Sequence, residues 1–376
     1  MNRRRLLAAM AGALPAAVLA SGEARAGAPA GPAQEWQSLP VPGGVPAAQL
    51  RRIAVAGPAA AWAVGEQGRS GPSQGQALAV HWNGSGWVQT DLSHLHYTGR
   101  FNDVAGISAT SAWCVGLPAA GAGPLLRWDG TTWREAAFPG STEPDVRLHS
   151  VAMDCDGRVW ASGSRGGSAA LLHKDGTSWQ WLAPLPAANA NLYRVVRGAP
   201  GEVWVCGDLA TGGGWSGFVA RWNGKWTVLP TLGGLRLSIG DVHAAAPDDI
   251  WAVGTEAGIG GPPGRPGSPV LAHFDGTAWT LNDPGFHVGA LTGIAADAQD
   301  RAAWISGWNY RDQTRSTYLH RAGATWAAVR GPAGAATAPY LNDVAAVPGT
   351  AEFRSVGMTA PSPVPPVQAY AERFAG

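Results

Sequence analysis

One pattern recurs along almost the whole chain and constrains its fold more than any other feature. A short apolar segment opens each unit, and about twelve residues later an aromatic residue begins a segment that ends in glycine, as in Trp251-Ala252-Val253-Gly254. The openings are Leu50, Phe101, Leu148, Leu192, Ile239, Leu291 and Leu341, and the aromatic residues are Trp62, Trp113, Trp160, Trp204, Trp251, Trp304 and Phe353. A spacing of roughly 44 to 52 residues is typical of repeats whose unit is one small sheet.

Each unit also carries a second hairpin signal, in which a tight turn separates two aromatic residues. The clearest copy is Trp128-Asp129-Gly130-Thr131-Thr132-Trp133, and related segments occur at 81–87, 173–179, 221–226, 273–279 and 320–326. Asn-Gly and Asp-Gly favour a turn whose two central residues both take positive φ. Two hairpins per unit predict four antiparallel strands, and seven units predict an all-β, seven-bladed β-propeller.

The two ends of the chain support a closed ring. The last unit reaches a third strand at 369–374 and stops without its closing Trp strand, whereas Glu35-Trp36-Gln37-Ser38-Leu39-Pro40 resembles such an outer strand and precedes the first unit. We therefore expect the N-terminal strand to complete the last blade of a propeller spanning residues 34–376. An open repeat array would need capping units instead.

The first 26 residues have the composition of a signal peptide. Arg3, Arg4 and Arg5 precede an apolar run at 6–20, and Ala24-Arg25-Ala26 offers a cleavage site, with 27–33 as a flexible segment before the propeller. The paired arginines favour a twin-arginine signal and a secreted or extracytoplasmic protein. Without this segment 23 basic and 25 acidic residues remain. That balance argues against nucleic acid as a partner, and no second long apolar run predicts a membrane span.

Residues that break the repeat are the candidates for function, because propeller ligands are usually held where connections between blades and turns within them share one rim. Histidines at 81, 173, 273 and 320 recur at one repeat position and are expected to be structural. Five others do not recur. Together with two carboxylates before blade three they form the candidate acid–base set: His94, His96, His149, His243, His287, Glu143 and Asp145. A divalent metal held by some of these groups is an alternative, because His-x-His places two imidazoles on one side of an extended segment.

Aromatic and hydrogen-bonding residues in atypical loops form a second candidate set, for ligand binding. They are Trp308, Tyr310 and Arg311 in blade six, Trp215 in blade four, and Tyr193 and Arg194 on the inner strand of blade four. A third set, Asp103, Asp241 and Asp343, occupies one repeat position two residues after the opening. We expect these carboxylates to accept hydrogen bonds from the backbone or from a neighbouring blade.

The repeats resemble those of exported bacterial propellers, whose functions are mostly unassigned, through their Trp-Ala-Val-Gly and Trp-Asp-Gly-Thr-x-Trp segments over residues 34–376. The turns are also similar to the Asp-box of sialidase-type propellers, with a shorter spacing, while WD40 and kelch propellers share only the architecture. A channel-mouth histidine with a divalent cation, as in streptogramin lyase, is an analogy of fold.

Three functions remain open on the sequence. The first is a monomeric binding scaffold that holds a peptide, glycan, protein or small molecule at the channel-mouth rim. The second is a lyase or hydrolase whose histidines and carboxylates converge on one pocket. The third is a structural role without a small-molecule site, which predicts a large apolar surface patch.

Overall fold

The computed structural model describes residues 35–42, 44–69, 75–119, 121, 123–233, 236–257, 267–333, 338–360 and 367–376. The predicted signal peptide and the 27–33 segment lie outside the described residues. Within the described ranges the chain forms twenty-eight strands and no helix. Accordingly, the described part contains no helix with the length and apolar character needed to cross a membrane.

The strands make seven separate four-stranded sheets, all with antiparallel neighbours. The first three blades are β2 (Gln49–Gly57), β3 (Ala60–Gln67), β4 (Gln76–Trp82), β5 (Trp87–Gln89); β6 (Gly99–Ser108), β7 (Ser111–Pro118), β8 (Leu125–Trp128), β9 (Trp133–Glu135); and β10 (Arg147–Met153), β11 (Val159–Arg165), β12 (Ser168–Asp175), β13 (Ser178–Trp181). The next three are β14 (Ala190–Arg197), β15 (Val203–Thr211), β16 (Gly214–Trp222), β17 (Trp226–Val228); β18 (Leu237–Ala246), β19 (Asp249–Glu256), β20 (Ser268–Phe274), β21 (Trp279–Leu281); and β22 (Gly289–Ala296), β23 (Ala302–Asn309), β24 (Asp312–Ala322), β25 (Thr325–Arg330).

The seventh blade joins the two ends of the described chain. Its order is β26 (Ala338–Ala346), β27 (Phe353–Ala360), β28 (Gln368–Phe374) and then β1 (Trp36–Leu39). Trp36 pairs with Phe374 and Leu39 with Ala371 in an antiparallel register. The predicted closure of the last blade by the N-terminal strand is therefore confirmed, and with it the all-β, seven-bladed propeller.

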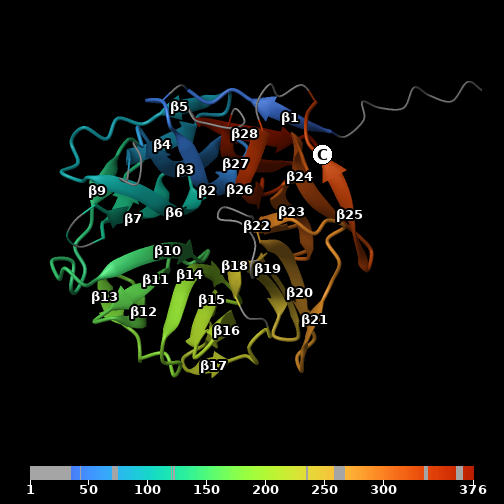
Figure 1. Ribbon diagram of the computed structural model, residues 1–376. Helices are drawn as coiled ribbons and strands as arrows, with labels where there is room; N and C mark the ends of the chain where they lie inside the picture. Colours follow the sequence, from blue (N-terminus) through green and yellow to red (C-terminus); the bar gives the residue numbers. More distant parts are fainter. Residues whose placement is uncertain are drawn as a thin grey trace, which may run out of the picture. The chain divides into compact units, whose positions relative to one another are not determined.

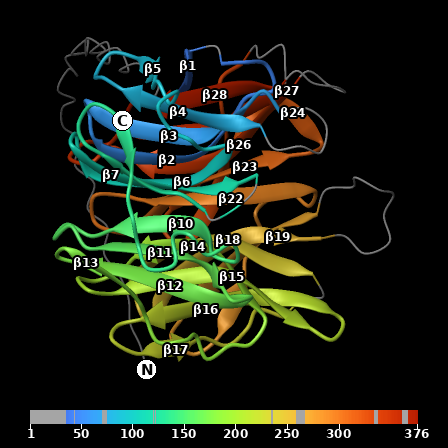
Figure 2. The ribbon, with the colours of Figure 1, turned by 90° about the vertical axis from the view of Figure 1, so that its left-hand side faces the viewer.

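The sheets form a ring in which the first strand of each unit is innermost (Figure 1). The side view in Figure 2 shows β2, β3 and β6 running roughly along the axis of the ring. Because neighbouring strands are antiparallel, inner strands begin at the same end of the ring as the turns between second and third strands. We call this end the mouth. The connections from one blade to the next reach the ring there too.

Every inner strand has an irregularity at the same step. The register shifts between the opening residue and the residue two positions later in all seven blades. A bulge of this kind leaves one residue without a partner and turns its side chain. These seven bulged residues are Arg51, Asn102, His149, Tyr193, Gly240, Thr292 and Asn342.

The turns between third and fourth strands differ from the expectation. Only the glycine of each pair takes positive φ, for example 101° at Gly130, and Asp129 is not among the positive-φ residues. The Asp129 side chain instead accepts the backbone amides of Thr131 (3.0 Å) and Thr132 (2.9 Å) through Oδ1. The prediction that both central residues take positive φ is wrong here, because this side-chain acceptor stabilises a longer turn.

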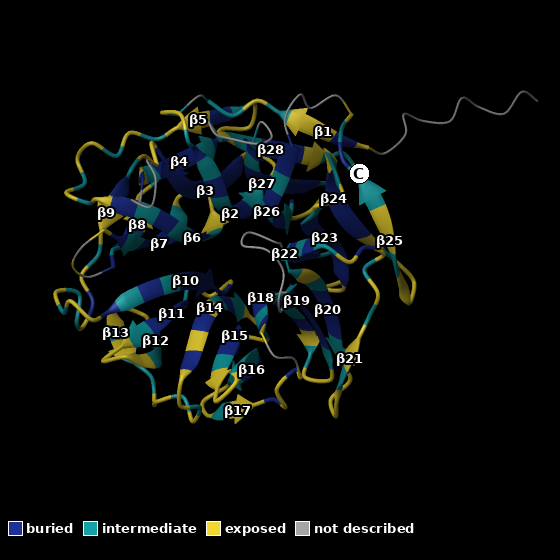
Figure 3. Cartoon of the chain, in the orientation of Figure 1, coloured by how far each residue is buried: buried dark blue, intermediate teal, exposed yellow. Residues whose placement is uncertain are grey.

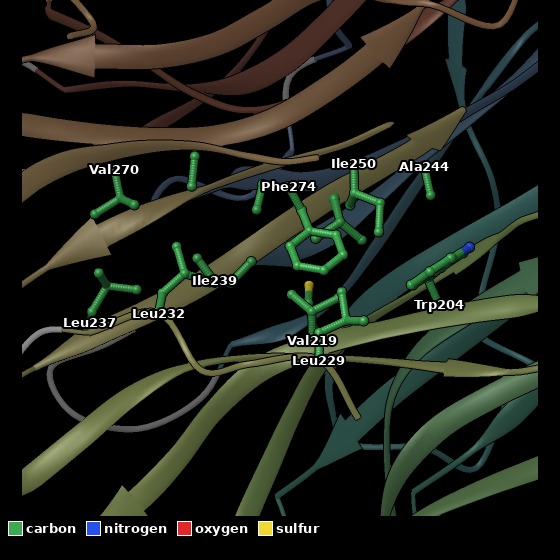
Figure 4. Packing of buried hydrophobic residues seen from close by; sticks show 14 residues of the cluster. Trp204, Val219, Leu229, Leu232, Leu237, Ile239, Ala244, Ile250, Val270 and Phe274 are labelled. Atoms are coloured by element: carbon green, nitrogen blue, oxygen red, sulfur yellow. The ribbon is translucent and has the colours of Figure 1, made fainter. Parts of the chain in front are cut away.

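Neighbouring blades pack face to face and supply the core. Figure 4 shows one such contact, in which Trp204 and Val219 of blade four meet Ile239 and Phe274 of blade five. Trp62, Trp160 and Trp204 are among the largest fully buried side chains. In Figure 3 buried residues follow the inner and middle strands, while exposed residues concentrate at the outer strands. The recurring tryptophans of the second strand are therefore scaffold, as their period predicts.

Candidate functional site

The position two residues after each opening carries hydrogen bonds between blades. Asp103 Oδ2 accepts the amide of Val151 in the next blade at 3.0 Å, and Asp241 Oδ2 accepts that of Ile294 at 3.2 Å. The same bond joins Ser150 to Val195 and Asp343 to Ile53, each at 3.0 Å. The interblade role expected for the three aspartates is confirmed by these bonds.

Three bulged residues add a second series of interblade bonds. His149 Nδ1 lies 2.9 Å from the carbonyl oxygen of Leu192, and Thr292 Oγ1 donates to that of Leu341 at 3.0 Å. Asn342 Nδ2 donates to the carbonyl of Leu50 at 2.7 Å. In each pair the acceptor is the opening residue of the next blade. The bulge thus places a polar side chain where it can join neighbouring inner strands.

Two arginines cross the axis of the ring and join blades that are not neighbours. Arg194 of blade four contacts Asp103 (Nη1–Oδ1 2.6 Å), Asp241 (Nε–Oδ1 3.2 Å) and Asp343 (Nη2–Oδ2 3.7 Å) of blades two, five and seven. Arg52 of blade one lies 3.5 Å from Asp343 Oδ1 and donates to the carbonyl of Gly240 in blade five at 3.2 Å. We call these five charged residues the channel plug.

The plug holds three carboxylates against two guanidinium groups, and this imbalance affects their protonation. Burial disfavours the charged form of Arg194, but the three surrounding carboxylates outweigh it and raise the pKa of Arg194 further above its ordinary value. Burial raises the pKa of Asp343 to about 6, against the opposing influence of Arg194 and Arg52. The middle of the channel is therefore a satisfied ionic network, which explains why Arg194 is conformationally fixed rather than available at the rim.

The mouth side of the plug has a basic arc made by three consecutive blades. Arg51 is the bulged residue of blade one, while Arg100 and Arg147 directly precede the openings of blades two and three. Arg100 Nε donates to Asn102 Oδ1 at 3.1 Å, and Arg147 Nη1 donates to the carbonyls of Pro144 (2.6 Å) and Val146 (3.0 Å). Among the described residues, none of the three arginines forms an ion pair within 4.0 Å of a carboxylate. None of the three guanidinium groups is therefore directly paired with a described carboxylate, although the charge of the buried Glu66 acts on Arg51.

Shifts in pKa show that charges of the basic arc act on Arg51 and on the neighbouring His149. Burial, followed by the charge of Arg100, lowers the pKa of Arg51 to about 10. Burial also lowers the pKa of His149, and the charges of Arg100 and Arg147 lower it further. Like charges at partly buried positions are unfavourable without a counter-ion. A bound anion would remove that cost.

Aromatic residues occupy other parts of the mouth. The bulged Tyr193 of blade four is 41% exposed, and its hydroxyl donates to the buried Asp208 Oδ2 at 2.7 Å. Trp308 lies edge-on to Tyr340, with ring centroids 5.4 Å apart, across the junction of blades six and seven. Tyr310, in the turn of blade six, is 53% exposed. The mouth therefore presents cationic groups on blades one to three and aromatic groups on blades four, six and seven.

The remaining predicted ligand residues have more local roles. Trp215 lies near the tip of the blade-four hairpin, with the guanidinium carbon of Arg236 5.7 Å from its ring centroid. Arg311 is exposed, and its backbone amide donates to Asn309 Oδ1 at 3.0 Å. Arg194 belongs to the channel plug. The predicted ligand set is thus divided between the mouth end, where Trp215 and Arg311 lie at turns between second and third strands, and the buried network.

The candidate acid–base residues are not joined to one another by any contact found among the described residues. His94 Nε2 lies 2.7 Å from the carbonyl oxygen of Trp133, in the outer strand of blade two. His96 lines a separate pocket over blade two, and His287 is exposed in the connection to blade six. Their catalytic role stays a prediction without a shared pocket.

The two carboxylates of that set are committed to blade three. Glu143 forms a two-point contact with Arg165, at 3.0 Å to Nε and 2.9 Å to Nη2. Asp145 Oδ2 accepts the backbone amide of Gly166 at 2.8 Å. Both contacts attach the connection before blade three to a turn of the same blade. The described residues also contain no group of three or more His, Cys, Asp or Glu side chains suited to a metal ion.

His243 lies at the opposite end of the ring from the mouth. Its Nε2 is 2.9 Å from the carbonyl oxygen of Asp300, in the turn between the first two strands of blade six. It lines a cavity of about 1330 Å³ that reaches Arg194 and Asp241 of the plug from that side. His243 therefore does not lie with the candidate histidines of the mouth, and its catalytic role stays a prediction.

Sequence reasoning missed the basic arc. Its signal was present as arginine next to the opening residue in three consecutive units, at 51, 100 and 147. The arginines at 51 and 100 or 147 do not occupy the same repeat position, one lying after and the others before the opening. The bulge brings these two positions to one level of the mouth, and nothing in the spacing predicts the bulge.

Comparisons with known proteins agree with this architecture and define the class. The chain is similar to the solved structure of YCF48 bound to D1 peptide (TM-score 0.58, 15% identity, 91% of this chain and 97% of that one) and to YCF48 from Cyanidioschyzon merolae (0.56, 17%, 91% and 99%). It is also similar to the extracellular domain of a hybrid two-component system from B. thetaiotaomicron (0.55, 12%, 89% of this chain and 39% of that one). No family model and no curated protein sequence matches the chain. These likenesses show the β-propeller fold.

Proposed function

We propose that this chain is an extracytoplasmic binding scaffold whose mouth holds a peptide segment bearing carboxylate groups. The observation that carries the proposal is the basic arc: three guanidinium groups on consecutive blades at the mouth, none of them in an ion pair with a carboxylate of the described residues. Guanidinium groups bind carboxylates through paired, charge-assisted hydrogen bonds. The channel plug joins the inner strands on which or next to which these arginines lie.

The aromatic residues of the mouth support a peptide over a simple anion. Tyr193, Tyr310 and the Trp308–Tyr340 pair offer flat, partly exposed rings on the side of the ring away from the basic arc. Tyrosine and tryptophan are enriched where proteins bind other chains, since they bury much area with few rotamers. One similar structure, YCF48 bound to D1 peptide, is consistent with a peptide ligand on this fold.

The test uses two fluorescein-labelled peptides of equal length, one built of Glu and Tyr and one of Lys and Tyr, with affinity measured by fluorescence anisotropy. We expect binding of the acidic peptide only, weakened by added salt. The Arg51→Gln/Arg147→Gln variant is expected to lose about a hundredfold in affinity, at about tenfold for each lost ionic contact.

A charge-matched control is Arg134→Gln/Arg373→Gln, because Arg134 lies on the outer strand β9 and Arg373 on β28, which pairs with the outer strand β1. This variant should bind the acidic peptide as the unchanged protein does. Equal loss in both variants would mean that net charge alone is responsible, and equal binding of both peptides would contradict the proposal.

Export to an extracytoplasmic compartment is part of the same proposal and rests on the sequence at 1–26. N-terminal sequencing of the protein recovered from its exporting host should begin at Gly27. A chain that retains Arg3, Arg4 and Arg5 would contradict this part of the proposal.

A further inference from the structure

A second concave site lies over blade two, separate from the basic arc. It is a pocket of about 530 Å³, which we call the blade-two pocket. Three segments form it: the connection entering β6, the ends of β7 and β8, and the connection leaving β9. Its volume falls within the range of pockets that hold small molecules.

The apolar side of the pocket is held rigidly. The Tyr97 ring stacks on Phe101 with centroids 5.6 Å apart and planes within 8°, and its hydroxyl donates to the carbonyl of Arg100 at 2.7 Å. Phe138 is buried and lies edge-on to Trp181, with centroids 6.4 Å apart. Pro118 and Pro124 complete this side of the pocket. Such fixed rings provide flat apolar surfaces without an entropic cost at binding.

The backbone around the pocket is already hydrogen-bonded. The amide of Ala119 donates to Thr98 O at 2.9 Å, and the amide of Ala136 donates to Leu125 O at 2.8 Å. These backbone groups are therefore not free for a ligand, which turns attention to the side chains. Five polar side chains line the pocket without a hydrogen bond to any described residue: His96, Thr98, Glu135, Ser141 and Thr142.

The types of these side chains restrict the ligand. Three hydroxyls and one imidazole can each donate and accept, while the Glu135 carboxylate accepts only. No Lys or Arg is among the lining residues, so the pocket offers no partner for an anionic group, and Glu135 would repel one. A neutral ligand with several hydroxyl groups and one apolar face matches both the polar and the aromatic sides.

We propose that the blade-two pocket binds a single neutral sugar ring. The ring lies with its apolar face against the partly exposed Tyr97, and its hydroxyls bond to His96, Glu135 and Thr142. This site is independent of the peptide site in the mouth, because the two share no residue. It also gives His96 a binding role in place of the acid–base role predicted for it.

The test uses the mature protein and five methyl pyranosides: those of glucose, galactose, mannose, fucose and N-acetylglucosamine. Saturation-transfer NMR identifies which glycoside binds, and calorimetry then measures its affinity. We expect at least one to bind, and the His96→Ala/Glu135→Ala variant to bind it roughly a hundredfold more weakly, about tenfold for each lost hydrogen-bonding group.

The matched control is His94→Ala. His94 lies two residues from His96 in the same connection, but its Nε2 faces the carbonyl of Trp133 outside the pocket lining. It should leave glycoside binding unchanged. The proposal would be overturned if none of the five glycosides showed saturation transfer, or if the control lost as much affinity as the double variant. It would also be overturned if the pocket bound the cationic aromatic amine phenethylamine in place of a glycoside.

Discussion

At the scale of residues, two adjacent positions on the inner strands have different tasks. The bulged residue bonds to its neighbours at the mouth, as His149 and Asn342 do. The residue after it points into the plug or across a blade junction, as Asp103 and Arg194 do. The residue types at both positions vary along the sequence, although several of them make the same interblade bond.

In blade six, Gly293 occupies the position that Asp103, Arg194 and Asp343 occupy in other blades. A larger residue does not fit there. A Cβ there would lie 2.7 Å from Asp343 Oδ1 and 3.0 Å from backbone atoms of Asp343 and Val344 in blade seven. We expect Gly293→Ala to destabilise the fold by about 1–3 kcal/mol, measured by urea unfolding. Gly240→Ala is the control, because its Cβ meets nothing closer than Val253 O at 3.9 Å. Similar losses in both variants would contradict this explanation.

Asp343 makes the stability of the ring depend on pH. Its pKa is raised from 3.8 to about 6 in the folded state, chiefly by burial, so the folded state binds the proton more tightly than the unfolded state. The protonated Asp343 side chain therefore stabilises the fold below about pH 4. This contribution, on the order of 3 kcal/mol, is lost as the pH rises through 6. Burial also raises the pKa of Glu372, which acts with the same sign.

The Asp343→Asn variant isolates this contribution. Unfolding free energies of both proteins, measured by urea from pH 4 to pH 7, give a difference in which Glu372 and the histidines cancel. We expect the unchanged protein to lose stability relative to the variant across that interval. A difference that does not vary with pH would show that the plug holds Asp343 ionised throughout.

At the scale of strands and turns, the sequence predicts what is periodic. The openings, the Trp segments and the Gly turns recur, and they predict the number of blades, the two hairpins in each and the closing strand at Trp36. The turn conformation at Asp129 was not predicted, since it depends on hydrogen bonds accepted by one side chain. The bulge at Asn102 was not predicted either, although it recurs in every blade, because the residue types at that position do not repeat. The basic arc depends on the bulge and was missed for the same reason.

The candidate site could be predicted only in its location. The rim of the mouth was expected from the fold, and Tyr193, Trp308 and Tyr310 lie there. Which groups carry free charge could not be predicted, because that depends on which ones are already paired. Glu143 is occupied by Arg165, whereas Arg51 has no carboxylate partner among the described residues.

At the scale of the whole molecule, the plug and the closing strand make the ring one unit. Arg194 joins blade four to blades two, five and seven, so one side chain spans the axis. Trp36 stacks on Tyr318 of blade six, with centroids 3.8 Å apart and planes within 5°. The last blade therefore needs the N-terminal strand for packing as well as for pairing.

This closure predicts that the chain can be cut and rejoined without loss of the fold. Joining Gly376 to Glu35 would connect the paired residues Phe374 and Trp36 through three residues, Ala375, Gly376 and Glu35. Blade four already has a three-residue turn, 223–225, between the paired Trp222 and Trp226, and its central residue is also glycine, with φ of 95°. The new turn therefore has a precedent in the same molecule.

The permuted chain begins at Gly44, contains this junction and ends at Val41. We expect its midpoint of urea unfolding to be nearly that of the original chain. The matched control begins at Gly44 and ends at Gly376, and so lacks β1. Losing the buried Trp36 alone should cost it about 3–5 kcal/mol. If the permuted chain is as unstable as the control, then β1 stabilises the ring through its connection to β2 rather than through the pairing and packing described above.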